Sequence, residues 1–284
     1  MTHLADTQEP TRLKPMQPAL YQLTEHARET KNSVTITLAP LGDPVPQGMP
    51  GQFNMLWAWG LGEIPISISA VPSPDVIVHT IREVGAVSHA LCAAKPGTAI
   101  GVRGPFGNTW PVDDARGHDV VIVAGGIGMA PLRPVIHAIL ADRSAFGDVT
   151  LVVGARHAKD LLFRGELDGW WRSQSIRVRT IVDESTPDWR GNVGIVTQEL
   201  RRVTVDPERT VAMVCGPEIM MRFVANHLID EGVDPEGIAV SMERNMQCGI
   251  GQCGHCQLAG DFVCTDGPVY TWQSALPLME VREL

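Results

Sequence analysis

The sequence predicts an N-terminal antiparallel β-barrel, an α/β domain with a doubly wound parallel sheet, and a small C-terminal domain built around a cysteine loop. Three observations predict this fold class: short strands punctuated by proline and glycine, then an alternating β/α series, then four clustered cysteines. We expect a flexible arm over residues 1–18, the barrel over 19–115, the α/β domain over 116–242 and the cysteine-containing domain over 243–284.

The barrel is predicted from short β patterns in the first third of the chain. Residues 34–38 alternate in the manner of a half-buried strand, and the apolar runs 76–78 and 99–102 follow. One helix is expected over residues 87–93, because the Lys-Pro-Gly sequence at 95–97 ends it. Several short strands with a single helix favour a small antiparallel barrel.

The pattern changes after residue 118. Residues 120–124 form a continuous apolar run, which is typical of a strand buried on both faces of a parallel sheet. Further strands are expected over 149–153, 176–182, 211–214 and 237–242, alternating with helices over 132–143, 160–172, 196–202 and 218–231. Such a series predicts a doubly wound sheet, in which ligands bind outside the carboxyl ends of the strands.

A glycine-rich turn connects the first strand of this series to its helix. It contains Gly125, Gly126 and Gly128, followed by Met129 and Pro131. Glycines at this place let the backbone approach a pyrophosphate, whose charge is favoured at a helix N-terminus. The spacing is not the G-x-G-x-x-G dinucleotide fingerprint, and a tight turn without a ligand is the alternative.

Four cysteines near the C-terminus have the spacing C-x4-C-x2-C-x7-C, formed by Cys248, Cys253, Cys256 and Cys264. The first three repeat the loop spacing of plant-type [2Fe-2S] ferredoxins. Glycines between them let the chain curl and leave backbone N–H groups free to point at sulfur. Structural zinc prefers two C-x2-C pairs, so the single pair here favours a cluster over zinc or disulfides.

Composition limits the remaining possibilities. A net charge of −9 without a basic run argues against a nucleic-acid partner. No apolar stretch approaches the roughly 20 residues of a membrane helix, so direct membrane insertion is not expected. The start of the chain lacks the apolar region of a secretory signal. Six cysteines, four of them clustered, indicate a reducing compartment, so we expect a cytoplasmic location.

The order of these motifs resembles the ferredoxin-NADP reductase superfamily. The barrel comes first, then Gly-Gly-x-Gly-x-x-Pro, then the Cys-Gly-Pro sequence at 215–217. The appended cysteine loop makes the chain similar to three kinds of subunit: the gamma subunit of cytoplasmic sulfhydrogenase-type nickel–iron hydrogenases, the B subunit of anaerobic sulfite reductase and the electron-transfer subunit of dihydroorotate dehydrogenase. The resemblance covers about residues 18–284.

The resemblance implies that the barrel binds FAD. Pro65, Ser67 and Ser69 match the flavin-binding strand of the superfamily, although an ordinary edge strand is the alternative. Many relatives carry an arginine just before this proline, which contacts the flavin phosphate. Here Ile64 follows Glu63, a departure that favours the hydrogenase and sulfite reductase groups over the dihydroorotate group.

The resemblance also places the flavin pyrophosphate at the start of the barrel helix. Gly85, Val87 and Ser88 open this helix, and its N-terminal N–H groups suit a phosphate. A plain helix cap explains Ser88 equally well.

Five further positions are implied for the pyridine nucleotide, NAD(P)(H). In relatives the cysteine of Cys-Gly-Pro lies beside the nicotinamide, which assigns Cys215 to that place, with Gly216 and Pro217 at the same strand end. Glu243 falls where the superfamily places an acid near the nicotinamide, and an ion pair with Arg244 is its alternative. Arg156 is expected either to face a phosphate or to be an ordinary solvated arginine. We therefore expect Cys215 and Glu243 to be the catalytic residues, acting by alignment of the nicotinamide with the flavin rather than by acid–base work.

Together these sites predict a flavin-dependent NAD(P)H oxidoreductase that relays electrons. A nicotinamide delivers two electrons as a hydride and a [2Fe-2S] cluster carries one, whereas a flavin exchanges both ways. The expected partner is a nickel–iron hydrogenase in a hetero-oligomeric complex. The alternatives are sulfite reductase, dihydroorotate dehydrogenase, and a stand-alone reductase serving a ferredoxin or an oxygenase. A zinc-knuckle interaction module is the alternative that is not an enzyme.

Overall fold

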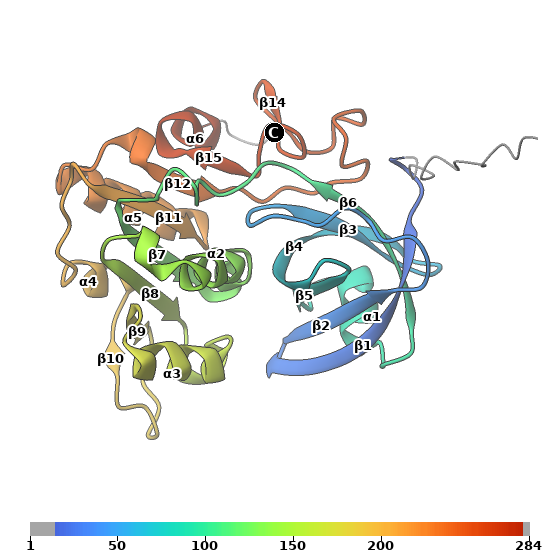
Figure 1. Cartoon of the computed structure of the whole chain (residues 1–284), viewed down its shortest axis with the longest axis horizontal. Helices are drawn as coiled ribbons and strands as arrows, with labels where there is room; N and C mark the ends of the chain where they lie inside the picture. Colours follow the sequence, from blue (N-terminus) through green and yellow to red (C-terminus); the bar gives the residue numbers. More distant parts are fainter. Residues whose placement is uncertain (1–14, 281–284) are drawn as a thin grey trace, which may run out of the picture.

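The computed structural model describes residues 15–280. The arm expected over residues 1–18 therefore lies largely outside the described residues. Figure 1 shows the barrel and the α/β domain side by side, with the C-terminal segment lying across the region where they meet. The contact between these three parts is what builds the sites described below.

Six antiparallel strands close the barrel in the order β1-β2-β5-β4-β3-β6. The strands are Ala19–Thr30 (β1), Ser33–Pro40 (β2), Phe53–Ala58 (β3), Gly62–Ser73 (β4), Val76–Arg82 (β5) and Ala99–Phe106 (β6). Helix α1, Ala86–Ala93, turns Leu91 and Cys92 into the barrel core. The predicted barrel with its single helix is confirmed, and β1 and β3 are strands that the sequence patterns did not reveal.

Seven strands form the second sheet, in the order β10-β9-β8-β7-β11-β12-β15. They are Asp119–Gly125 (β7), Val149–Ala155 (β8), Arg177–Val182 (β9), Asn192–Val193 (β10), Thr210–Cys215 (β11), Ile238–Ser241 (β12) and Val269–Thr271 (β15). All pairings are parallel except that of β12 with β15. The chain leaves β7 toward β8 and later returns beside β7 as β11, which creates a crevice at their carboxyl ends.

Helices cover both faces of this sheet because β7 is apolar on both sides. Val120, Ile122 and Ala124 pack with α2 (Met129–Ala141) and α3 (Arg164–Ser173). Val121 and Val123 pack in the opposite core with α4 (Val196–Leu200), α5 (Glu218–Asp230) and α6 (Trp272–Met279). This arrangement confirms the doubly wound sheet predicted from the apolar run.

The C-terminal segment begins as a loop and ends inside the sheet. After β12 the chain forms the cysteine loop, residues 247–264, which includes a two-stranded ribbon, Gln257–Leu258 (β13) and Asp261–Phe262 (β14). It then returns as β15 and α6, which pack on the α/β domain (Figure 1). Short 3-10 turns occur at Gly126–Gly128, Arg143–Ala145, Ala158–Asp160 and Pro235–Gly237. Within residues 15–280, none of the helices combines the length and apolar character needed to cross a bilayer.

Candidate functional site

A cavity of about 990 Å³ lies where the barrel, the α/β domain and the cysteine loop meet. The barrel contributes residues 64–67 of β4, the end of β5 and the start of α1. The opposite wall comes from α2 and residues 241–246, and residues 255 and 257–259 of the cysteine loop close one side. Its size and mixed lining suit a cofactor, because ligand cavities are commonly about 300–1,000 Å³.

A second cavity of about 580 Å³ adjoins the first. It lies over the glycine turn after β7 and the Cys-Gly-Pro turn after β11, at the crevice of the parallel sheet. The two cavities share six lining residues: Arg82, Ile127, Ser241, Met242, Glu243 and Arg244. Ligands bound in the two cavities would therefore both contact this shared wall.

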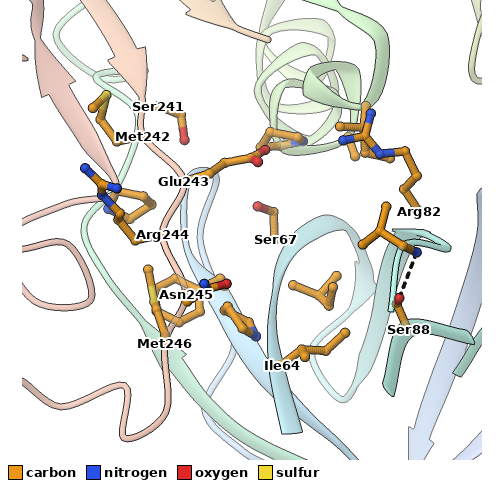
Figure 2. A pocket seen from close by; sticks show the side chains of 18 of the residues that line it. Ile64, Ser67, Arg82, Ser88, Ser241, Met242, Glu243, Arg244, Asn245 and Met246 are labelled. Atoms are coloured by element: carbon orange, nitrogen blue, oxygen red, sulfur yellow. Dashed lines mark hydrogen bonds between the residues drawn. The ribbon is translucent and has the colours of Figure 1, made fainter. Parts of the chain in front are cut away.

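The structure brings most of the sequence-predicted residues to these two cavities. The first is lined by Pro65, Ser67, Gly85, Val87, Ser88, Pro131, Cys215 and Glu243. The second is lined by Gly125, Gly126, Gly216, Pro217 and again Glu243. Figure 2 shows the Glu243 carboxylate and the Ser67 hydroxyl turned toward the same part of the first cavity, although they come from different domains. Ser69, Gly128, Met129 and Arg156 line neither cavity.

The hydroxyl groups of Ser69 and Ser88 make hydrogen bonds within the protein itself. Ser69 is buried in the barrel, where its hydroxyl donates to the carbonyl of Val78 at 3.1 Å and accepts from Thr80. The Ser88 hydroxyl accepts from the N–H groups of Val84 and Gly85 at 3.0 and 2.9 Å, so it fixes the turn that begins α1 (Figure 2). This geometry supports the capping alternative for Ser88. Gly85 has open space where a Cβ would stand, so a phosphate can approach this helix start.

A buried histidine supports the strand that carries Ser67. His79 on β5 is fully buried, and its Nδ1 donates to the carbonyl of Ser67 at 3.0 Å. Its Nε2 has no hydrogen-bond partner among the described residues. Burial lowers the pKa of His79 to about 4, against the opposing effect of the backbone carbonyls of Ser67 and Ile66. The imidazole is therefore neutral at physiological pH.

We expect His79 to make the protein acid-sensitive. Its pKa is about 4 in the folded chain and near 6.5 in the unfolded chain. At a pH between these values, His79 therefore takes up a proton when the chain unfolds. Stability is complete above about pH 6.5 and falls by roughly 3 kcal/mol, at most, as the pH drops toward 4. Urea unfolding of His79→Leu between pH 4 and 7 should show a flatter pH dependence than the wild type. Parallel curves for the two proteins would contradict the assignment.

The glycine turn of the second cavity is set by close backbone packing. Gly126 has φ +54° with open space where a Cβ would be, so its backbone faces the cavity unobstructed. A Cβ on Gly128 would stand 2.7 Å from the nitrogen of Gly216 and closer still to the carbonyl of Cys215. Gly128 therefore serves the site indirectly, because it lets the start of α2 lie against the end of β11.

Cys215 lies at the end of β11, in the wall of the first cavity. Burial, together with the nearby charge of Glu243, raises the pKa of the Cys215 thiol well above its ordinary value. The group is a neutral thiol, not a thiolate nucleophile. Its small side chain suits a position where two planar ring systems approach one another.

Arg156 lies at the carboxyl end of β8, exposed and paired. Its Nε donates to Glu184 at 3.1 Å, and Glu184 also contacts His157 at 3.1 Å. The Arg156 side chain is 72% exposed. The structure thus places Arg156 at the expected edge of the sheet but engaged with an acid, and a phosphate contact stays a prediction.

Arg82 is a candidate site residue that the sequence analysis did not single out. It ends β5 and lines both cavities, close to the start of α1 (Figure 2). This position offers a cation near the expected pyrophosphate, where the usual arginine before Pro65 is replaced by Ile64. The only sequence signal was an arginine two residues before Val84-Gly85, which is too common a pattern to interpret alone.

The cysteine loop points backbone N–H groups at two of its sulfurs. The N–H groups of Ile250, Gln252 and Cys253 donate to the Cys248 sulfur at 3.3–3.4 Å. Gly251 donates to the Cys264 sulfur at 3.2 Å. Positive φ angles of 70–74° at glycines 249, 251 and 254 make this curl possible. Such N–H···S bonds are the interactions that stabilise sulfur ligands of an iron–sulfur cluster.

Burial, backbone N–H groups and neighbouring thiols shift the pKa values of two of these cysteines, Cys248 and Cys264. Burial would raise the pKa of Cys248, but the N–H groups facing its sulfur outweigh this and lower it to about 6. Burial and the neighbouring Cys256 raise the pKa of Cys264 to about 12. Within residues 15–280 no three His, Cys, Asp or Glu side chains converge on one ion. A [2Fe-2S] cluster needs no such group, because each iron takes two protein ligands.

Comparison with known proteins agrees with this geometry. Residues 122–226 match the oxidoreductase NAD-binding domain, and residues 243–274 match the iron-sulfur cluster binding domain of dihydroorotate dehydrogenase B. The gamma subunit of sulfhydrogenase 1 from Pyrococcus furiosus is 39% identical over 230 residues, or 78% of this chain and 79% of that one. A probable dihydroorotate dehydrogenase B electron-transfer subunit from Methanothermobacter thermautotrophicus is 35% identical, covering 82% and 81%.

Solved structures share all or part of this architecture. That of an NADH-dependent reduced ferredoxin-NADP oxidoreductase, studied for flavin-based electron bifurcation, matches with a TM-score of 0.72 and 26% identity over 93% of this chain and 94% of that one. The FAD/NAD-binding domain of a Vibrio cholerae nitric oxide dioxygenase has a TM-score of 0.70 at 20% identity, covering 79% and 98%. The latter match, at this identity, supports the fold alone.

The fold and the matches define a flavin-dependent NAD(P)H oxidoreductase of the ferredoxin-NADP reductase superfamily, with FAD, NAD(P)(H) and a [2Fe-2S] cluster as its cofactors. The chain belongs to the family of iron–sulfur electron-transfer subunits that includes the sulfhydrogenase gamma subunits and those of dihydroorotate dehydrogenase B. The predicted superfamily, fold class, cofactors and electron-transfer function are confirmed. The roles of individual site residues stay predictions.

Proposed function

We propose that this chain couples NAD(P)(H) to a nickel–iron hydrogenase-type partner in a hetero-oligomeric complex. The observation that carries the relay is the shared wall of the two cavities, together with the cysteine loop that lines the larger one. The nucleotide cavity, the flavin cavity and the cysteine loop follow one another in the order that electrons must take from a two-electron donor to a one-electron acceptor. When bound, FAD would supply the exchange between electron pairs and single electrons.

The residues of the chain contribute positioning rather than acid–base chemistry. Ser67 and the start of α1 hold the flavin side, and the turns at 125–128 and 215–217 hold the nucleotide side. Glu243 on the shared wall orients the nicotinamide, and Cys215 in the wall of the first cavity leaves room for close approach. Alignment of reacting atoms accounts for much of the barrier reduction in such transfers.

The hydrogenase-type partner is supported by the relatives and by one substitution. Both gamma subunits of the Pyrococcus furiosus sulfhydrogenases are similar to this chain, at 39% and 35% identity. Glu63-Ile64 also stands where the dihydroorotate group carries an arginine before the proline. The match of residues 243–274 favours a dihydroorotate dehydrogenase B partner as the second candidate. We expect the complex in the cytoplasm, because four clustered thiols require a reducing compartment to bind iron.

Anaerobic visible spectroscopy of the purified chain tests this function. Flavin and cluster bands should both bleach when NADH or NADPH is added, and the more effective nucleotide identifies the natural one. A colourless protein that carries zinc would overturn the proposal. Co-purification of the full chain with a nickel-containing subunit would support the hydrogenase partner, and recovery with a flavin-containing dihydroorotate dehydrogenase subunit would support the second candidate.

Arg82→Met tests the flavin site separately. We expect FAD to bind about 10- to 100-fold more weakly, because one charged hydrogen bond to a phosphate is worth roughly 1.5–3 kcal/mol. The cluster should be unaffected, since Arg82 lies on the cavity wall shared with the nucleotide site rather than at the cysteine loop. Fluorescence titration of released flavin measures the affinity. Unchanged affinity would place the pyrophosphate elsewhere.

A further inference from the structure

Arg103 is a buried arginine that the relay described above does not use. It lies on β6 of the barrel and is only 2% exposed. Its guanidinium nevertheless reaches the cysteine loop, where it donates to the carbonyl of Cys248 at 2.9 Å and to that of Gln247 at 3.1 Å. It also donates to the carbonyl of Pro15 at 2.8 Å. A barrel side chain thus holds the backbone of the first expected cluster ligand.

The other side of the same guanidinium holds the flavin-binding strand. Nε and Nη2 of Arg103 donate to the two carboxylate oxygens of Glu63 at 2.9 and 2.5 Å. Glu63 lies on β4, directly before Ile64, where β4 begins to line the large cavity. A two-pronged arginine–carboxylate contact of this kind fixes geometry as well as charge. One side chain therefore joins the cavity wall to the cysteine loop.

Aromatic side chains also connect the cavity wall to the cysteine loop. The guanidinium of Arg103 lies 5.4 Å from the ring centroid of Phe106, also on β6. Phe106 lies 5.9 Å, between ring centroids, from Phe53, which lines the large cavity. A Cβ on Gly249 would stand 3.0 Å from the Phe106 ring, so the cysteine loop packs directly on it. Packing against β6 thus fixes where the first part of the cysteine loop lies relative to the cavity.

We propose that Arg103 is a positioning residue for electron passage, and that the Arg103–Glu63 pair also sets the reduction potential of the cluster. The inference rests on the proposed FAD-to-cluster relay. Electron transfer slows steeply with distance, so a fixed loop keeps the rate high. Reduction adds one electron, and therefore one negative charge, to the cluster. A buried cation beside Cys248 stabilises this form, and the carboxylate of Glu63 opposes it.

The two members of the pair should shift the potential in opposite directions. In the full-length holoprotein, Arg103→Met removes the cation and should make the cluster harder to reduce. Glu63→Gln keeps the shape but leaves the guanidinium uncompensated, so the cluster should become easier to reduce. An anaerobic redox titration followed by electron paramagnetic resonance measures both shifts. Arg116→Met is the control for loss of an arginine, because Arg116 forms a half-exposed pair with Asp142 on the α/β domain, away from the loop.

Arg103→Lys distinguishes the effect of the hydrogen bonds that hold the loop in position from the effect of the positive charge. Lysine keeps the cation but cannot hold Glu63 and two carbonyls together. We expect a smaller shift in potential than for Arg103→Met, and slower cluster reduction after the flavin is reduced. Amide hydrogen exchange in residues 247–256 should be about tenfold faster, which corresponds to the loss of one charged hydrogen bond.

The outcomes distinguish this inference from the function on which it rests. If the wild type shows no [2Fe-2S] signal, the relay itself is wrong. If the wild type has the signal but Arg103→Met and Glu63→Gln change the potential no more than Arg116→Met does, the inference is overturned. Shifts of the same sign in both variants would overturn it too, since they would indicate general loosening of the structure.

Discussion

Cys253→Ser should remove the cluster while leaving the flavin and nucleotide sites working. Cys253 is the one exposed cysteine among the four of the loop, so a serine there leaves the buried core of the segment intact. We expect the iron content and the cluster absorption to be lost. Flavin reduction by NAD(P)H should persist within about twofold, because no wall of the nucleotide cavity changes. Transfer to one-electron acceptors should fall by about 10²-fold or more.

Iron analysis and stopped-flow spectroscopy of the same preparation measure the two effects. Cys92→Ala is the control, since it removes a cysteine on α1, outside the loop. It should keep the visible absorption of both the flavin and the cluster. If flavin reduction disappeared together with the cluster in Cys253→Ser, the order of the relay would be wrong. Retention of the full iron content would show that Cys253 is not a ligand.

Gly128→Ala should have the largest effect of any single methyl group on the nucleotide site. The backbone of Gly128, at φ −59° and ψ −12°, is one that alanine adopts without strain. The added Cβ would press on the backbone of Cys215 and Gly216, neither of which can rotate away. We expect a loss of about 1–3 kcal/mol of stability. Flavin reduction by NAD(P)H should slow by about 10²-fold, because the start of α2 is displaced from the end of β11.

Gly169→Ala is the control for this change. Gly169 lies within α3 with nothing near its Cβ position, so alanine there should stabilise the protein by about 0.5–1 kcal/mol and leave flavin reduction unaltered. Thermal unfolding and single-turnover flavin reduction with NADH and NADPH measure both variants. A Gly128→Ala protein with normal single-turnover rates would show that the spacing between α2 and β11 does not govern the nucleotide site.

Local patterns predicted the fold and the cysteine loop well. The apolar run at 120–124, the turn after it and the cysteine spacing all depend on short-range geometry. The run is confirmed as a strand, the turn as a strand-to-helix connection and the cysteine spacing as part of an iron–sulfur segment. Ser69 shows where such patterns fail. Ser67 and Ser69 are two residues apart and would share a face of a regular strand. The pairing of β4 with β5 shifts between Ile68 and Ala70, and Ser69 lies inside the barrel instead.

Contacts between distant segments were beyond the reach of the sequence. Arg103 is separated from Cys248 by 145 residues, and no periodicity or motif relates the two. From the sequence alone, Glu63 stands out only as part of a departure from the superfamily pattern, and its arginine partner is visible only in three dimensions. Arg82 was missed for the same reason, because its meaning depends on two cavities that meet above the end of β5.

The antiparallel return of β15 beside β12 gives the cysteine segment the character of an enlarged hairpin connection. Ser241 pairs with Val269, and the N–H of Met242 donates to the carbonyl of Pro268 at 2.8 Å, so everything between them leaves and rejoins the sheet at one point. A segment attached in this way is a cassette: it can be lengthened, shortened or exchanged without altering the order of the strands below it. One reductase scaffold can therefore acquire different electron outlets by changing a single insertion.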